Sequence, residues 1–584
     1  MKYWIPNNWK DTFEHEGLLF FVQRMQEMLF HFSDDINRAP VHNTLTLIQE
    51  YRNTYREVKS GTIGEYQLIQ IYDEFKDSFQ HDKVLRKNLG DTYIEKLYNQ
   101  LNACPDPNKF NLIGYIWGVI NPSYMKWTVE YLKEHISQGN HKNEIEKGAR
   151  IWVANQIMYG YTGEFIYSYI EQFLVNNEID SLDILDEFFN RFDFEKRKYK
   201  VYIQLSENMS KYFEMLKTRL NLKFEDDGNF SLIQKKQKQK KKRVLCYLEI
   251  ESLDYYKAVD HAFQKINIFL KYFQFISDNR SHLLHKFGAV WDCENESMYQ
   301  MPVVPTGIKA IETQTSEVSA SLIDKIILGI QMNGNHGMEI FGKALILHNS
   351  ALQQQLPKDG FVNLWSILEV FCPQGTAKSK IDPISYSVLP VLQNNYFTIM
   401  FQTIRTDLKE NLLPNDYDEL MKNLEGENDI LKIAGFCLLP QYEQLREDIF
   451  KKIGNLPLLR HKIYSLYLLK NNKKELFDLS RRYRQRVQWH LYRLYRARNS
   501  IVHTGSVPPR IQVLGEHLHS YVDSVMSEIA FKLSVCDLFP NISSVFVDTA
   551  LLMKSKEEHF NNNGAITLSD LNVLLEDFFC PQIK

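Results

Sequence analysis

The segment 476-LFDLSRRYRQRVQWHLYRLYRARNSIVH-503 contains neither Gly nor Pro and is rich in residues that favour an α-helix. Thr504-Gly505 follows it directly, and Pro508-Pro509 comes soon after. Gly readily ends a helix and Pro cannot continue one. The segment therefore predicts a long helix that stops at about residue 503, and its spaced apolar positions indicate a face packed against other helices.

Three polar residues stand at the end of this helix: Arg498, Asn499 and His503. At about 100° per residue, Asn499 and His503 lie on one face of the helix. Arg498 lies about 140° from His503 on an ideal helix. Either the Arg498 side chain reaches round the helix, or the last turn loosens before Gly505.

These residue types suit the cleavage of RNA. The 2′-hydroxyl of RNA is a nucleophile beside the scissile phosphate, so an enzyme mainly has to move protons and stabilise a negatively charged phosphorus centre. An imidazole, with an unperturbed pKa of about 6.5, exchanges a proton at neutral pH. A guanidinium offers a fork of donors to phosphate oxygens. His503 and Arg498 are therefore the candidate catalytic residues, with Asn499 orienting a partner or the phosphate, and this chemistry needs no metal.

One such motif supplies one imidazole, whereas transesterification uses both a base and an acid. Two copies of the chain, related by a twofold axis at the end of this helix, would bring His503 and Arg498 of both copies to one cleft. We therefore expect a homodimer.

The pattern Arg-Asn-x-x-Val-His resembles the signature of the HEPN superfamily, and most closely its Apea-like branch. Two upstream segments, 343-KALILHNSALQ-353 and 361-FVNLWSILEVF-371, are similar to the preceding helices of Apea-like HEPN proteins. Glu369 matches an acidic position there, where it would accept a hydrogen bond from Arg498 and orient it, or form a structural ion pair. The resemblance covers roughly residues 315–540, and the stretch between Phe371 and the motif helix is longer than a minimal domain needs.

The resemblance implies an up-and-down four-helix bundle that dimerises and acts as a metal-independent endoribonuclease. Such a protein cleaves RNA, tRNA included, by 2′-hydroxyl attack that leaves 2′,3′-cyclic phosphate ends. It typically serves antiphage defence or toxin-like abortive infection, which implies restraint by a regulatory partner or activation by a phage trigger. We also expect residues 1–310 to take part in that restraint.

Two alternatives remain open. The chain is a catalytically inactive HEPN protein that binds RNA or protein or serves as a dimerisation module, or the motif is coincidental and the chain is a helical scaffold. The chain contains no GxxxxGK loop, GxSxG elbow or HExxH helix, which leaves other common enzyme classes without support.

Two basic sets are candidates for RNA contact. Arg486, Arg493 and Arg496 lie on the motif helix among aromatic residues that stack on bases in other proteins. A second set, Lys240, Lys241, Lys242 and Arg243, belongs to 235-KKQKQKKKR-243. The alternative for the first set is a partly core-facing helix, and for the second a solvated loop.

The length of 584 residues predicts several domains, and the mostly helical patterns along the chain predict a mainly α protein. Residues 1–195 read as amphipathic helices, and 196–310 read as a small α/β domain because 199-YKVYIQL-205 and 244-VLCYLEI-250 resemble strands. The HEPN domain is expected over 315–540, with a C-terminal extension over 541–584.

Composition places further bounds. The chain has 44% hydrophobic and 24% charged residues and a formal charge of −3, so RNA binding must rest on local basic faces. Its seven cysteines never form a CxxC pair, and His517 and His519, two apart on a helix, point to different faces, so we expect no metal and no cofactor. The N-terminus lacks a signal-peptide pattern, and there is no uninterrupted run of about eighteen apolar residues. We expect a cytoplasmic protein without membrane contact.

Overall fold

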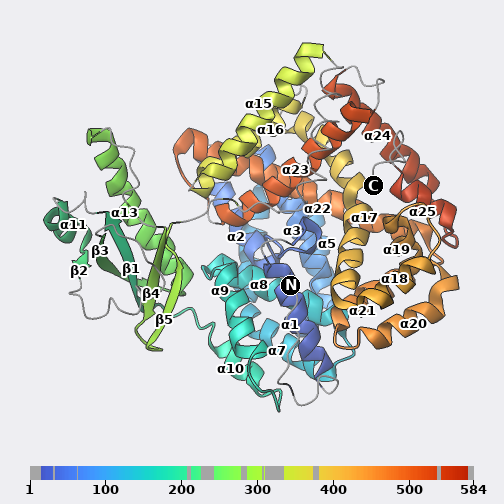
Figure 1. Cartoon of the computed structure of the whole chain (residues 1–584), viewed down its shortest axis with the longest axis horizontal. Helices are drawn as coiled ribbons and strands as arrows, with labels where there is room; N and C mark the ends of the chain where they lie inside the picture. Colours follow the sequence, from blue (N-terminus) through green and yellow to red (C-terminus); the bar gives the residue numbers. More distant parts are fainter. Residues whose placement is uncertain are drawn as a thin grey trace. The chain divides into compact units, whose positions relative to one another are not determined.

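The chain folds mainly into helices, with one small antiparallel sheet (Figure 1). The computed structural model describes residues 9, 15–30, 33–61, 63–206, 212–224, 243–277, 284, 286–304, 308, 334–354, 356–372, 380–508, 510–535 and 541–576. The predicted mainly α class is confirmed. No helix in these ranges combines the length and the apolar character that a bilayer span requires.

Contacts group the chain into two compact units. The first combines residues 1–155, 175–182 and 308–584, and the second combines 156–174 and 183–307. The N-terminal helices thus share a unit with the C-terminal helices, whereas the sequence predicted separate domains. The HEPN bundle over 315–540 stays a prediction.

The N-terminal part of the first unit is built from amphipathic helices with side-chain caps. Asn43 and Thr46 form a reciprocal capping box, and Asp82 accepts a hydrogen bond from the Leu85 backbone N–H, which satisfies free amides at two helix starts. The helices are α1 Glu16–Leu29, η1 Asp35–Asn37, α2 Thr44–Lys59, α3 Tyr66–His81, α4 Lys83–Leu89, α5 Asp91–Ala103, α6 Asp106–Ile120, α7 Tyr124–Gln138 and α8 Lys142–Tyr159, whose residues from 156 onward belong to the second unit.

The C-terminal part of the first unit contains the helix predicted from 476 to 503. It runs as α22 from Lys473 to Asn499 and continues as a π-helical turn, η6, from Ser500 to Thr504, so the predicted helix is confirmed. α22 packs against α17, α16 and α23 around one apolar core (Figure 1). The other elements are α15 Gly334–Gln353, α16 Pro357–Phe371, α17 Ile381–Asn411, α18 Pro414–Lys422, α19 Asp429–Leu438, η5 Pro440–Tyr442, α20 Glu443–Lys452, α21 Pro457–Tyr467, α23 Ile511–Val535, α24 Ile542–His559 and α25 Leu568–Leu575.

The second unit is the α/β part of the chain. Both predicted strands are confirmed, as β1 Arg197–Ser206 and β3 Arg243–Ser252, which pair antiparallel in the sheet order β2-β3-β1-β4-β5. Helix α13 packs against β1, β3 and β4 (Figure 1). The other elements are α9 Gly163–Ile170, η2 Glu171–Val175, which ends in the first unit, α10 Ile184–Asn190, α11 Phe213–Leu220, β2 Lys223–Phe224, α13 Tyr255–Ser277, β4 Phe287–Asp292 and β5 Ser297–Pro302.

Buried ion pairs join the N-terminal helices to the middle of α22. The Arg493 guanidinium contacts Glu50 at 2.8 Å and Glu74 at 2.5 Å, and Arg496 contacts Glu50 at 2.7 Å. Burial would lower the pKa of Arg493, but the two carboxylates outweigh it and hold that pKa above its usual range. Burial likewise opposes ionisation of Glu50, yet the Arg493 guanidinium, together with Arg496, keeps the pKa of Glu50 well below its ordinary value. Arg493 and Glu50 are therefore ionised in the folded chain, whereas burial raises the pKa of Glu74.

The Arg493→Ala variant tests this cluster. The substitution removes the guanidinium that Glu50 and Glu74 share, while both carboxylates stay buried. We therefore expect the free energy of unfolding to fall by about 3–5 kcal/mol. Arg482→Ala is the matched control, because Arg482 is an exposed arginine of the same helix; its change should stay within about 0.5 kcal/mol. Chemical denaturation followed by circular dichroism measures both, and equal losses would contradict a special role for Arg493.

Two buried histidines make the stability of the first unit depend on pH. Burial lowers the pKa of His42 and of His490 well below 6.5. Each stays neutral in the folded chain and takes up a proton in the unfolded chain, so their stabilising contribution is present above about pH 6.5 and is lost as the pH falls below it. The loss reaches up to about 1.4 kcal/mol per pH unit for each histidine.

The test compares the wild type with His490→Gln between pH 7 and pH 5. The variant should lose less stability over this range than the wild type. The loss in the variant must be compared with the loss in the wild type, because other groups also titrate in this range. Burial raises the pKa of Asp254 and of Asp260 in the second unit to about 6, so these two carboxyls stabilise the folded chain more as the pH falls. Thermal unfolding at each pH measures this loss. If the melting temperature falls equally in both proteins between pH 7 and pH 5, His490 does not cause the pH dependence.

Candidate active site at the end of helix α22

The end of α22 is a π-helical turn, Ser500–Thr504, closed by Gly505 in the left-handed region at φ 68°. The Gly505 N–H donates to the Ile501 carbonyl at 3.1 Å, and the Thr504 hydroxyl donates to the Ser500 carbonyl at 2.7 Å. Ile501, Val502 and Thr504 are β-branched and favour the α-helix less than the preceding residues do. Ile501 still packs against the core of α16, α17, α22 and α23, which holds the turn in place.

This turn changes the angle about the helix axis that is expected between the side chains of Arg498 and His503. Hydrogen bonds in a π-helix join residues five apart, so a side chain five positions further on lies about one turn above the first. On a regular α-helix the two side chains would diverge by about 140°. Of the two alternatives that the sequence left open, the structure has the loosened last turn.

Arg498 contacts both of its expected neighbours. Its Nη1 donates to the Asn499 side-chain oxygen at 3.2 Å, and its Nη2 lies 3.3 Å from a carboxylate oxygen of Glu369 on α16. The other oxygen of Glu369 accepts from the indole N–H of buried Trp365 at 2.9 Å. Arg498 and Glu369 keep 23% and 35% of their side-chain surface exposed, so a substrate phosphate has access to the guanidinium.

Trp365 was not among the predicted site residues. It lies four residues before Glu369 on α16, and this spacing puts both side chains on one helix face. Its ring also packs against Tyr495 of α22, with 5.8 Å between ring centroids. Trp365 therefore fixes Glu369 from one side while Arg498 pairs with it from the other.

His503 is exposed on the turn, together with Val502 and Val507. Within the described part of the chain, no hydrogen bond or ion pair involves its ring. The imidazole is therefore available to a ligand or to another protein surface.

The arginines in the middle of α22 do not fit the predicted role in RNA binding. Arg493 and Arg496 pair with Glu50, and Arg486 pairs with Asp35 at 3.0 Å. Helical periodicity turns them toward the N-terminal helices, where carboxylates neutralise them. They offer no free cationic surface to a phosphate.

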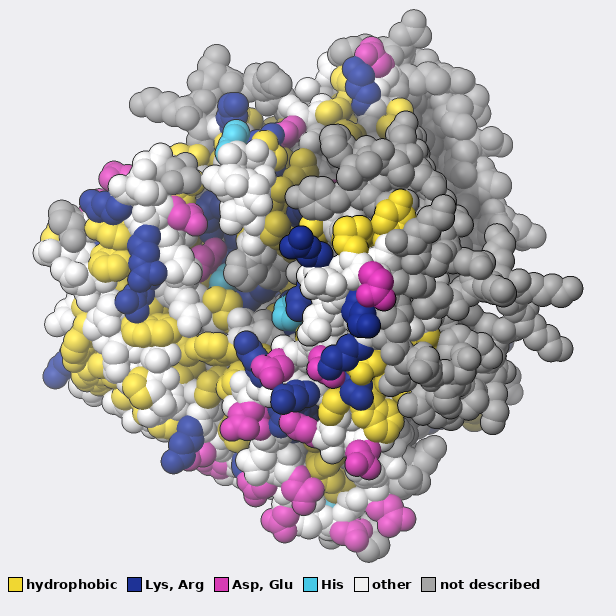
Figure 2. Space-filling model, turned by 90° about the vertical axis from the view of Figure 1, so that its left-hand side faces the viewer, with side chains coloured by type: hydrophobic (Ala, Val, Ile, Leu, Met, Phe, Trp, Pro, Cys, Tyr) yellow, Lys and Arg dark blue, Asp and Glu magenta, His cyan; other side chains and the backbone are white. Residues whose placement is uncertain are grey.

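The second predicted RNA-binding set is only partly described. Lys240, Lys241 and Lys242 lie outside the described residues, and Arg243 begins β3 opposite Ser206. Figure 2 shows basic and acidic side chains intermingled on the face that it draws, so the described residues of that face form no single basic field.

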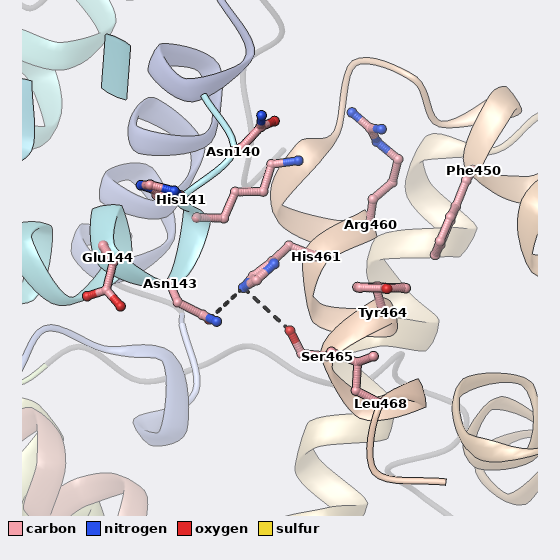
Figure 3. Close-up of a pocket in the computed structure, with 11 residues that line it drawn as sticks. Asn140, His141, Asn143, Glu144, Phe450, Arg460, His461, Tyr464, Ser465 and Leu468 are labelled. Carbon is pink, nitrogen blue, oxygen red and sulfur yellow. Dashed lines mark hydrogen bonds between the residues drawn. The ribbon is translucent and has the colours of Figure 1, made fainter. Parts of the chain in front are cut away.

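A cavity of about 540 Å³ lies between the start of α8 and α21 (Figure 3). His461 points across it and bonds to Asn143 at 3.0 Å, and the cations at its rim, Lys142 and Arg460, both contact Glu16. None of the predicted catalytic residues lines this cavity. The candidate site at the end of α22 is an exposed surface instead.

Two groups of residues in the described ranges have the composition of metal sites. One is the buried set Asp35, His490 and His517, and the other is the half-buried set His348, His519 and Asp523. His517 and His519 point to different faces, as predicted, and each joins its own group. The sequence signal that was overlooked is the four-residue spacing of His519 and Asp523, which places both on one helix face.

The Gly505→Ala variant tests what ends the π turn. Nothing lies within 4 Å of a Cβ built at this position, so the cost comes only from the left-handed backbone, and we expect a loss of about 1 kcal/mol in stability. Gly118→Ala in α6 is the control, because its Cβ also meets no neighbour while its backbone is helical; it should gain about 0.5–1 kcal/mol. Thermal unfolding measures both, and a gain for Gly505→Ala would contradict the assignment.

Comparisons with known proteins add no relative: no protein-family model matches the chain, and neither the curated proteins nor the solved structures give a significant match. The function must be argued from the chemistry of the site.

Proposed function

We propose that this protein is a metal-independent endoribonuclease of the HEPN type, with Arg498, Asn499 and His503 as catalytic residues. The observation that carries the proposal is the π turn that follows Arg498 and carries His503, because hydrogen bonding between residues five apart favours a smaller angle between these two side chains than a regular α-helix gives. Glu369 acts as a positioning residue through its contact with Arg498.

Each residue has one role in the proposed reaction. The Arg498 guanidinium has five N–H donors, of which Asn499 and Glu369 each accept one, so donors remain for the oxygens of a crowded phosphate. The His503 imidazole takes the proton from the 2′-hydroxyl or gives one to the leaving 5′-oxygen. The products are a 2′,3′-cyclic phosphate and a free 5′-hydroxyl.

A second copy of the chain completes the proposed site. One imidazole cannot serve as base and acid in the same step, and His503 is flanked by the exposed apolar side chains of Val502 and Val507. A twofold contact at this helix end would cover these apolar side chains and bring a second His503 to the same phosphate.

The proposed setting is defence against phage, with tRNA or other RNA as substrate and a partner or phage component as trigger. In this proposal the N-terminal residues do not act as a detachable inhibitory domain, because residues 1–155 share one compact unit with α22. Removing residues 1–155 would take away Glu50 and Glu74 and leave Arg493 unpaired. Activation in this proposal therefore acts on the intact chain.

The test is an RNA-cleavage assay with purified full-length protein in EDTA. We expect cleavage that leaves 2′,3′-cyclic phosphate ends, and His503→Ala should slow it by at least about 100-fold, the usual contribution of a general acid or base. His81→Ala is the control, because His81 is a helix histidine with 70% of its side chain exposed, on α3; it should leave the rate unchanged.

Three outcomes would overturn the proposal. Cleavage that persists in His503→Ala would assign it to a contaminant or to other residues. No cleavage by a protein that forms dimers would favour the inactive HEPN module that binds RNA or protein. A monomer without activity would favour a helical scaffold in which the motif is coincidental.

A further inference from the structure

Three potential metal ligands converge between α15 and α23. The Nε2 atom of His348 on α15 lies 3.1 Å from Nε2 of His519 and 2.9 Å from a carboxylate oxygen of Asp523, both on α23. The other carboxylate oxygen of Asp523 lies 3.4 Å from His519 Nε2. The side chain of His519 is 4% exposed, that of His348 is 22% exposed and that of Asp523 is 42% exposed, so the group is anchored in the protein but open to solvent on one side.

Hydrogen bonds alone do not account well for this arrangement. A neutral imidazole carries one N–H, and here both Nε2 atoms face each other and the same carboxylate. If both donate to Asp523, two N–H groups oppose each other across 3.1 Å. If only one donates, its single hydrogen is divided between a nitrogen and an oxygen. A metal ion at the centre would resolve this conflict, because each of the three atoms would direct a lone pair toward the ion.

The separations match those between ligands of one metal ion. Zinc binds imidazole nitrogen and carboxylate oxygen at about 2.0–2.2 Å in tetrahedral geometry, which puts neighbouring ligand atoms about 3.3 Å apart. The three measured separations, 2.9, 3.1 and 3.4 Å, lie around this value. Two imidazoles and one carboxylate are also a donor set suited to divalent first-row transition metals.

The second histidine group provides an internal comparison. His517 contacts Asp35, but the same carboxylate also pairs with Arg486 at 3.0 Å, and all three members of that group are buried. A permanent guanidinium already neutralises Asp35 and would repel a metal ion. We find no such cation in contact with Asp523 among the described ion pairs.

We propose that His348, His519 and Asp523 bind one divalent transition-metal ion of the zinc type, with water at the open coordination position. The ion links α15 to α23, and both helices pack against α16, which carries Glu369 and Trp365 (Figure 1). Its role is to hold these three helices together. The site uses none of the residues proposed to cleave RNA, so the EDTA in the cleavage assay would remove this ion without removing a catalytic group.

The experiment is a zinc titration of the full-length protein after treatment with a chelator and its removal. Calorimetry and elemental analysis should give one tightly bound Zn²⁺ per chain, and Zn²⁺ should raise the melting temperature by at least about 2 °C, because a ligand that binds only the folded state stabilises it. His348→Ala and Asp523→Asn change the two more exposed ligands. Each should weaken zinc binding by at least about 10-fold and abolish the rise in melting temperature.

Two control variants make the result specific. His81→Ala removes a surface histidine that pairs with Asp77 four residues earlier, and His503→Ala removes the proposed catalytic histidine; both should bind zinc as the wild type does. Melting of all variants in EDTA shows whether they are folded before zinc is added. Failure of the ribonuclease assay would leave this result untouched, because zinc binding is measured directly.

A wild type that binds no Zn²⁺ would overturn the proposal, as would a bound ion that His348→Ala and Asp523→Asn both retain at full affinity. The group would then be a pair of histidines hydrogen-bonded to Asp523. Should one variant not fold, the other still decides between these outcomes, because each alone removes one of the three ligands.

Discussion

The contact between Arg493 and the carboxylates of Glu50 and Glu74 is the constraint on which the first unit depends. It joins residues that are 443 and 419 positions apart in the sequence. A guanidinium with 5% of its side chain exposed is tolerated only with full ionic and hydrogen-bonding compensation. Separating α2 and α3 from α22 would therefore leave buried charges without their partners.

The same constraint divides α22 into two functional parts. In the middle of α22, Arg486 pairs with Asp35, and Arg493 and Arg496 pair with Glu50. These ion pairs fix the orientation of α22 about its own axis. Its end carries Arg498 and His503 beyond the last of these ion pairs, where solvent has access. A fixed rotation of the helix matters for a catalytic proposal, because it sets the direction in which the terminal side chains point.

Helix α16 connects the end of α22 with the His348, His519 and Asp523 group. Glu369 and Trp365 lie on this helix and contact Arg498 and Tyr495 of α22. On its other sides α16 packs against α15 and α23, the helices that carry His348, His519 and Asp523. An ion at that histidine group would limit movement of α16 and so stabilise the pairing of Glu369 with Arg498, although it takes no part in the proposed chemistry.

The sequence by itself determined the features that depend on local propensity. These are the long helix that ends before Gly505, the two strands at the centre of the sheet, and the proximity of Arg498 to Asn499. It left open whether the Arg498 side chain reaches round a regular helix or the last turn loosens, and the structure has the loosened turn. Only the tertiary structure decided the partners of α22. Helical periodicity shows which residues share a face, but the groups opposite that face, such as Glu50 and Glu74, come from helices hundreds of residues away. For the same reason the convergence of His348 with His519 and Asp523 was not foreseen, because the distance between α15 and α23 is set by how both pack against α16.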